Sequence, residues 1–197
     1  MPEFHIIDIA MIIFSYLAGS ICTAIILARI LGLPDPRTQG SGNPGATNML
    51  RVGGKKAAAM TLAGDMLKGV IPVLIARVVG VQPELLIVVG FAAFLGHLYP
   101  VFFRFQGGKG VATAIGMLIA ANWMIALFTV STWLLMSFLS KISSLSALTA
   151  FLLTPIFAGI VGGDNKKFTI IVLSILTIML IWRHRSNIRN LLNGTET

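Results

Sequence analysis

Long apolar runs, each close to the length that crosses a lipid bilayer, dominate this sequence. A membrane-spanning helix needs about 20 mainly apolar residues, within a range of roughly 17–25. The runs cover residues 6–30, 57–80, 84–103, 111–140, 145–161 and 168–182. The 197-residue chain is 56% apolar and 11% charged, whereas soluble domains carry about 25% charged residues. A soluble globular fold is therefore excluded, and lipid is the solvent for most of the chain.

The run over 111–140 decides the number of spans. It is too long for one helix and short for two. Asn122 and Trp123 suit a membrane interface, so we divide the run there. We predict an all-α integral membrane fold with seven transmembrane helices, short interfacial helices and Gly-rich cytoplasmic loops. Six helices is the alternative, if this run crosses only once.

The distribution of Lys and Arg predicts the orientation. Glu3 and Asp8 lie in an N-terminus without a positive segment, so we treat this end as the first span and not as a cleaved signal. With seven spans and the N-terminus outside, only Lys166 and Lys167 lie outside, and Lys68 and Arg77 lie within a span. The remaining Lys and Arg lie inside: Arg29, Arg37, Arg51, Lys55, Lys56, Arg104, Lys109, Lys141, Arg183, Arg185 and Arg189. This asymmetry predicts an N-out, C-in protein.

The net charge of +8 then describes a cationic cytoplasmic face, which attracts anionic lipid and anionic substrates and does not imply nucleic acid. Cys22 is the single cysteine, and His5, His97 and His184 are far apart. We expect no disulfide, no redox motif, no metal site and no cofactor. No repeat or second domain is visible, so we predict a single domain over 1–197.

The first cytoplasmic segment, 38–51, is rich in glycine. Glycines allow a ligand to approach the backbone closely, and Asn43 followed by Pro44 predicts the cap and first turn of a short helix. On that helix Pro44, Thr47, Asn48 and Arg51 would share a face. A Gly-rich entry into a helix with a nearby Arg predicts a phosphate site. A turn followed by an amphipathic surface helix is the alternative.

The second segment, 96–113, contains Gly107, Gly108, Lys109 and Gly110 before another apolar run. A Walker A loop is excluded, because Phe103 and Gly110 occupy its required Gly and Ser/Thr positions. Phosphate contact remains reasonable. The alternative for Lys109 is an anchor at the membrane interface.

Two further segments, 141–145 and 183–192, are predicted to place polar groups at the same cytoplasmic face. Ser143 and Ser144 would donate to a phosphate, although capping of the following helix is the better expectation for at least one of them. If the last span continues as a helix, His184, Asn187 and Leu191 share a face. A basic amphipathic tail that binds anionic lipid explains the same residues.

The second span contains Asp65 and Lys68, one helical turn apart. Charges within a span indicate function by default, but we favour a buried structural pair. Taken together, the four cytoplasmic segments predict a site at the inner interface for an anionic, phosphorylated ligand.

Residues 40–48 (GSGNPGATN), Gly96-His97 with 105–113 (FQGGKGVAT), and 184–188 (HRSNI) with 194–196 resemble motifs of the bacterial PlsY family. These are integral membrane acyl-phosphate:glycerol-3-phosphate acyltransferases. The resemblance covers nearly the whole chain. Gln106 stands where the family pattern leads us to expect a lysine.

The resemblance implies transfer of an acyl group from acyl phosphate to the sn-1 hydroxyl of glycerol 3-phosphate. Lysophosphatidic acid and phosphate are the products, in phospholipid biosynthesis at the cytoplasmic face of the bacterial inner membrane. The implied partners are glycerol 3-phosphate, acyl phosphate and membrane lipids, with no obligate protein partner. Glu196 matches the family's terminal acid, and we expect a structural role for it, such as pairing with an arginine.

Matching the motifs residue by residue gives the expected site. The catalytic candidates are Ser41, Arg51, Lys109, His184 and Asn187. The substrate- and phosphate-binding candidates are Gly42, Asn43, Gly45, Thr47, Asn48, Gly107, Gly108, Gly110, Ser143 and Ser144. The base that accepts the hydroxyl proton is His184 or a substrate phosphate. An acyl-serine intermediate is less favoured, because no Gly-x-Ser-x-Gly motif is present.

Three other classes compete. A transporter of phosphorylated molecules predicts repeats and several polar groups at mid-membrane, which the sequence does not show. An acyltransferase using acyl-CoA or acyl carrier protein predicts a His-x-x-x-x-Asp motif. Phe102 and Arg189 occupy the fifth positions after His97 and His184, which excludes this class. A lipid-binding scaffold leaves the Gly-rich segments unexplained.

Overall fold

The computed structural model describes residues 5–163 and 165–196. Within these residues the regular structure is helical and no strand is present, which confirms the all-α prediction. The chain divides into two compact units, Met1–Ala121 and Asn122–Thr197.

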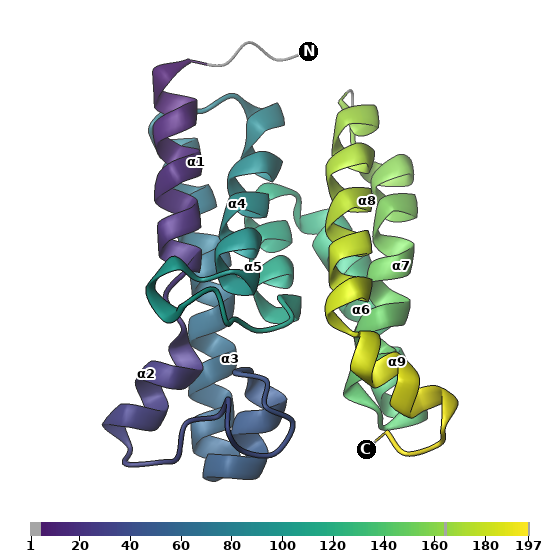
Figure 1. Ribbon diagram of the computed structural model, residues 1–197. Coiled ribbons are helices and arrows are strands. Elements are labelled where there is room, and N and C mark those ends of the chain that lie inside the picture. Colours follow the sequence, from purple (N-terminus) through teal and green to yellow (C-terminus); the bar gives the residue numbers. More distant parts are fainter. Residues whose placement is uncertain (1–4, 164, 197) are drawn as a thin grey trace. The chain divides into compact units, whose positions relative to one another are not determined.

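The first unit is arranged around one long helix. Its helices are α1 (Ile6–Gly19), α2 (Thr23–Ile30), α3 (Ala46–Val78), α4 (Leu86–Leu98) and α5 (Val111–Ala121), with short 3₁₀ turns at Pro83–Leu85 and Val101–Phe103. Helix α3 packs against α1, α2, α4 and α5, so it is the centre of this unit (Figure 1).

Glycines let α3 and α5 approach closely. A Cβ atom at Gly69 would lie 2.3 Å from the carbonyl oxygen of Thr113, and one at Gly116 would lie 2.2 Å from the carbonyl oxygen of Met66. Small residues at helix contacts allow this backbone-to-backbone packing, which drives helix association in lipid. The two glycines therefore fix the position of α5 on α3.

The first apolar run is interrupted, although the sequence predicts one continuous span. Helices α1 and α2 meet at an angle of 41° across Ser20, Ile21 and Cys22. A break within a span frees backbone groups that require other partners. Lys68 supplies one of them, because its Nζ donates to the carbonyl oxygen of Ile21 at 2.8 Å.

The second unit contains α6 (Trp123–Ser140), α7 (Ser143–Val161), α8 (Lys166–Arg183) and α9 (Arg185–Leu192), with α7 packed against both α6 and α8. Asn122 caps α6, since its Oδ1 accepts hydrogen bonds from the N–H groups of Met124 and Ile125, each at 3.2 Å. The predicted division of the 111–140 run at Asn122 is confirmed.

The last span does not continue as one helix, so the condition for a face shared by His184, Asn187 and Leu191 is not met. Helix α8 ends at Arg183, and α9 departs from it at an angle of 61°. His184 is the junction residue, so it does not share a helix face with Asn187 and Leu191.

Large apolar side chains cover the outside of both units, as lipid requires. Val78 is 86% exposed and Phe138 is 81% exposed. Among the described residues four helical stretches are long and apolar enough to cross a membrane: α3, Pro83–Phe103 around α4, α6 and α7. The count rises to six if each bent pair, α1 with α2 and α8 with α9, is one span, and α5 is a shorter apolar helix.

Candidate active site

One buried amide shapes the first Gly-rich loop. Asn48, in the first turn of α3, is 1% exposed. Its Nδ2 donates to the carbonyl oxygens of Pro36 at 2.8 Å and Gln39 at 3.0 Å, and its Oδ1 accepts from the Ser41 N–H at 2.9 Å. A Cβ atom at Gly40 would lie 2.3 Å from the same Oδ1. The amide of Asn48 therefore holds the loop that carries Ser41, whereas the sequence placed it among the phosphate ligands.

The start of α3 differs from the prediction. The helix begins at Ala46 after Gly45, and no side chain caps it. Asn43 is not the cap, and its carbonyl oxygen instead accepts the Gly45 N–H at 2.9 Å. The predicted Asn43–Pro44 cap is wrong, because the chain makes one more turn before the helix begins. A helix start without a side-chain cap is the arrangement in which backbone N–H groups bind anions.

Helix α3 changes direction at Gly54, where φ is 75° and ψ is −172°. The stretch before Gly54 is thus the predicted short helix. Thr47 and Arg51 are exposed on it, whereas Pro44 and Asn48 are buried. The four residues predicted to share a face are therefore divided, and Thr47 and Arg51 are the ones that a ligand can reach.

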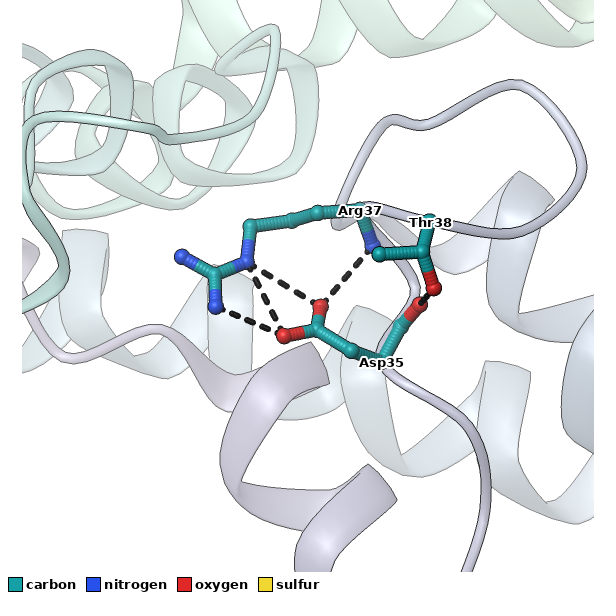
Figure 2. A network of polar contacts seen from close by, with 3 residues as sticks. All are labelled: Asp35, Arg37 and Thr38. Carbon is teal, nitrogen blue, oxygen red and sulfur yellow. Dashed lines mark hydrogen bonds and ion pairs between the residues drawn. The ribbon is translucent and has the colours of Figure 1, made fainter.

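A local ion pair holds the entry to this loop (Figure 2). Arg37 donates to the Asp35 carboxylate through Nη2 at 2.6 Å and through Nε at 3.0 Å, and the Thr38 hydroxyl donates to the Asp35 carbonyl oxygen at 3.0 Å. The hydrogen bonds from Arg37 lower the pKa of Asp35 below its usual value, and the same contact raises the pKa of Arg37. Arg37 is thus engaged in holding the loop.

The second segment packs under α4 and leads into α5. Gly107, Gly108 and Gly110 are buried, and Lys109 is half-buried. Gly110 has a φ of 90°, and a Cβ atom there would lie 2.3 Å from the ring of Phe94. Helix α5 begins directly after it, so this segment has the predicted form of a Gly-rich entry to a helix N-terminus with an adjacent cation.

The predicted Asp65–Lys68 pair is confirmed, with 2.9 Å between Asp65 Oδ1 and Lys68 Nζ. The structure adds His97, whose Nδ1 lies 3.6 Å from the same oxygen. The Gly108 N–H donates to the carbonyl oxygen of His97 at 3.1 Å. Sequence reasoning did not assign His97 to the site, and the available signal was its place in the same motif as Gly107 and Lys109.

In the second unit, Glu196 gathers side chains from two helices. The Ser144 hydroxyl donates to its Oε1 at 2.6 Å, Asn187 Nδ2 donates to the same oxygen, and Asn190 Nδ2 donates to Oε2 at 3.1 Å. The capping role expected for Ser143 or Ser144 is wrong, because α7 is preceded by Ile142 and no side chain caps it.

His184 is 2% exposed at the junction between α8 and α9. Its Nδ1 lies 2.8 Å from the carbonyl oxygen of Leu180. A carbonyl only accepts, so Nδ1 carries the hydrogen and the neutral ring has its lone pair on Nε2. This tautomer suits a base or a hydrogen-bond acceptor at Nε2.

Each unit thus groups a set of predicted residues. The first holds two Gly-rich segments next to exposed or half-buried cations, and the second holds Ser144, Asn187 and His184 near the end of the chain. These features are typical of an integral membrane protein with polar, cationic segments at the ends of its helices.

Comparison with known proteins identifies the family. The sequence model described as glycerol-3-phosphate acyltransferase matches residues 9–194, and the chain belongs to this family. A glycerol-3-phosphate acyltransferase of Thioalkalivibrio sulfidiphilus is 51% identical over 187 residues, covering 95% of this chain and 91% of that protein. One from Methylococcus capsulatus is 50% identical over 183 residues, covering 93% and 91%.

A solved structure has the same fold. It is the crystal structure of PlsY (YgiH), an integral membrane glycerol 3-phosphate acyltransferase, in its glycerol 3-phosphate form. The TM-score is 0.89 at 40% identity, with 96% of this chain and 94% of that chain covered. The structure of its lysophosphatidic acid form matches with a TM-score of 0.86 at 38% identity, over the same shares of the two chains. The protein is therefore an acyltransferase, as the PlsY resemblance implied.

Proposed function

We propose that this acyltransferase moves an acyl group from acyl phosphate to the sn-1 hydroxyl of glycerol 3-phosphate. The hydroxyl oxygen attacks the acyl carbonyl carbon, the bond from that carbon to the phosphate oxygen breaks, and lysophosphatidic acid and inorganic phosphate leave. The observation that carries the proposal is the match to PlsY structures in a glycerol 3-phosphate form and a lysophosphatidic acid form. Both proposed substrates carry a phosphate, and this chain offers two Gly-rich helix entries.

In this proposal the first unit holds phosphate. The hydrogen-bond donors to phosphate come from three places. They are the exposed side chains of Thr47 and Arg51, the start of α3, which no side chain caps, and the Gly107–Gly110 segment with Lys109. The candidate residues before the start of α3 are Ser41, Gly42, Asn43 and Gly45. Such preorganised donors stabilise the charge that develops during acyl transfer. Asn48 contributes indirectly, because its side chain holds the loop that carries Ser41.

In the second unit, Ser143, Ser144, His184 and Asn187 orient glycerol 3-phosphate. An apolar cavity of about 330 Å³ beside them is lined by Leu145, Leu148, Thr149, Leu152, Leu153 and Ile181. Leu145 follows Ser144, and Ile181 lies one turn before His184, so the cavity is suited to an acyl chain whose reactive end lies at the polar cluster.

The proton of the attacking hydroxyl goes to His184 Nε2 or to a substrate phosphate. General-base catalysis contributes typically 10²–10⁴-fold, so His184→Ala separates the two routes. A fall in kcat of that size at saturating glycerol 3-phosphate supports the histidine route. A near-normal kcat with retained glycerol 3-phosphate binding supports the phosphate route.

We propose seven membrane crossings, with α1–α2 and α8–α9 as bent spans and the short α5 as the seventh. The proposed orientation has the N-terminus outside and the active site at the cytoplasmic face of the bacterial inner membrane. The excess of Lys and Arg on the proposed inner side supports this orientation. Accessibility labelling of single cysteines placed at Gly163 and at Lys55 tests it, because the two positions should lie on opposite sides.

The test of function uses purified protein in lipid vesicles with glycerol 3-phosphate and either palmitoyl phosphate or palmitoyl-CoA. Lysophosphatidic acid from palmitoyl phosphate alone is expected. Product from palmitoyl-CoA alone would contradict the proposed donor. No product from either donor, together with uptake of glycerol 3-phosphate into the vesicles, would favour the transporter.

A further inference from the structure

The first unit contains a buried charge cluster whose three residues are not among the proposed substrate ligands. Asp65 is 3% exposed, Lys68 8% and His97 5%. Replacing a buried ion pair by apolar residues is often neutral or stabilising, so such a pair is weak evidence for stability. Charges kept within a span instead indicate function. The contacts of the cluster show where that function lies.

Lys68 connects Asp65 to the break in the first apolar run. Its Nζ lies 2.9 Å from Asp65 Oδ1 and donates to the carbonyl oxygen of Ile21 at 2.8 Å. Ile21 directly precedes the start of α2, and α2 leads into the loop that Asn48 holds. The position of this break therefore influences where the first Gly-rich loop lies.

His97 connects Asp65 to the second Gly-rich segment. Its Nδ1 lies 3.6 Å from Asp65 Oδ1. At the opposite side of the ring, a Cβ atom on Gly108 would lie only 2.1 Å from Nε2. The backbone of His97 completes the contact, because its carbonyl oxygen accepts the Gly108 N–H at 3.1 Å and would lie 2.0 Å from a Cβ atom on Gly107. The Gly107–Gly108 backbone thus rests directly on His97.

We propose that Asp65 is a positioning residue for the acyltransferase reaction. Through His97 it fixes Gly107, Gly108 and the adjacent Lys109, and through Lys68 it fixes the break that leads to the first loop. One carboxylate thereby sets the relative placement of two Gly-rich segments that are far apart in the sequence. This inference rests on the proposed function, in which both segments hold substrate phosphate.

The size of the effect follows from how sharply transfer reactions depend on alignment. A misplacement of about 1 Å by a change remote from the reacting atoms lowers the rate about 10²-fold. Loss of Asp65 should therefore lower kcat/KM by about 10- to 100-fold.

The test uses a variant that leaves no unpaired buried charge. Asp65→Asn combined with Lys68→Met removes both charges together, since losing one partner alone is strongly destabilising. The folded double variant should show the fall in kcat/KM. His97→Ala, which leaves the Asp65–Lys68 pair intact, should show a similar fall. Adding His97→Ala to the double variant should lower kcat/KM little further, because residues in one network are not additive.

Asp8→Asn is the matched control. Asp8 is another buried carboxylate in the first unit, 1% exposed, and it accepts the His5 N–H at 2.8 Å at the start of its own helix. This variant should keep the wild-type kcat/KM.

The outcomes separate the two proposals. A folded Asp65→Asn/Lys68→Met protein with wild-type kcat and KM overturns the positioning role, whatever its unfolding temperature. If Lys109→Met and Arg51→Met also leave kcat and KM unchanged, the proposed phosphate site itself fails. If Lys109→Met changes kcat or KM while the Asp65→Asn/Lys68→Met variant keeps the wild-type values, only the inference about Asp65 is overturned.

Discussion

The Ser144 hydroxyl donates to Oε1 of Glu196 at 2.6 Å and so ties the start of α7 to the last residues that the structure describes. Asn187 and Asn190 of α9 donate to the same carboxylate. Glu196 therefore holds α9 and the α7 N-terminus together, and with them several residues proposed to bind substrate.

We expect Glu196→Ala to destabilise the protein and lower its activity. Hydrogen bonds to a charged group contribute about 1.5–3 kcal/mol each, and Ser144 and Asn187 lose theirs. Thermal unfolding in detergent and the acyltransferase rate measure the two effects. Glu196→Gln, which keeps one oxygen acceptor, should lose less, and an alanine variant with the wild-type unfolding temperature would contradict the expectation.

Asn48→Ala should disrupt the first Gly-rich loop. The change removes the donor to Pro36 and Gln39 and the acceptor for Ser41, and unsatisfied buried groups cost about 1–3 kcal/mol each. We expect KM for glycerol 3-phosphate to rise and the unfolding temperature to fall. Gln39→Ala is the control, because its backbone carbonyl is retained and its side chain is exposed. Equal effects of the two changes would argue against an anchoring role for Asn48.

The Asp35–Arg37 pair should give a pH-dependent contribution to stability. The pKa of Asp35 is lowered in the folded state by Arg37, so the contribution is present above the ordinary Asp value of about 3.9 and is lost as pH falls through the lower folded value. The difference in unfolding temperature between wild type and Asp35→Asn should therefore be largest near neutral pH and shrink below about pH 4. A difference that stays constant from pH 7 to pH 3 would refute this account.

Gly116→Ala should loosen the contact between α3 and α5. The added methyl group would lie 2.2 Å from the Met66 carbonyl oxygen, and overpacking of this kind costs typically about 1–3 kcal/mol. Gly159→Ala is the matched helical control, since its Cβ would meet only Ile170 Cδ1 at 3.7 Å. Thermal unfolding of both variants should show a loss for Gly116→Ala alone. A loss of similar size in both would mean that close packing is not the cause.

The helices were predictable from the sequence because their signal is local. The apolar runs over 57–80, 84–103, 145–161 and 168–182 each correspond to one helix, and Asn122 both suits an interface and caps α6. The bends at Ile21 and His184 could not be predicted from the lengths of the apolar runs. Ile21 lies inside one run and His184 lies just after another, so the apolar pattern gives no sign of either bend. At Ile21 the hydrogen-bond donor is Lys68, which lies in another helix.

The candidate site was predictable as a set of segments but not residue by residue. Glycines and cations within one motif identify a segment as a candidate for ligand binding. The direction in which each side chain points depends instead on contacts with residues far away in the sequence. Asn48 is the example. An amide near a Gly-rich loop can bind a ligand or hold the loop itself, and the burial of Asn48 shows that its side chain holds the loop. His97 is the reverse case, since its contact with Asp65 joins helices that the sequence does not pair.

The break at Ile21 also has a consequence for the order of assembly. In hydrocarbon no water is available to satisfy a freed carbonyl, and the donor Lys68 lies 47 residues further along the chain. We therefore expect the bent arrangement of α1 and α2 to be stable only once α3 has packed beside them. Folding of the first unit is then expected to couple the placement of α1 and α2 to that of α3.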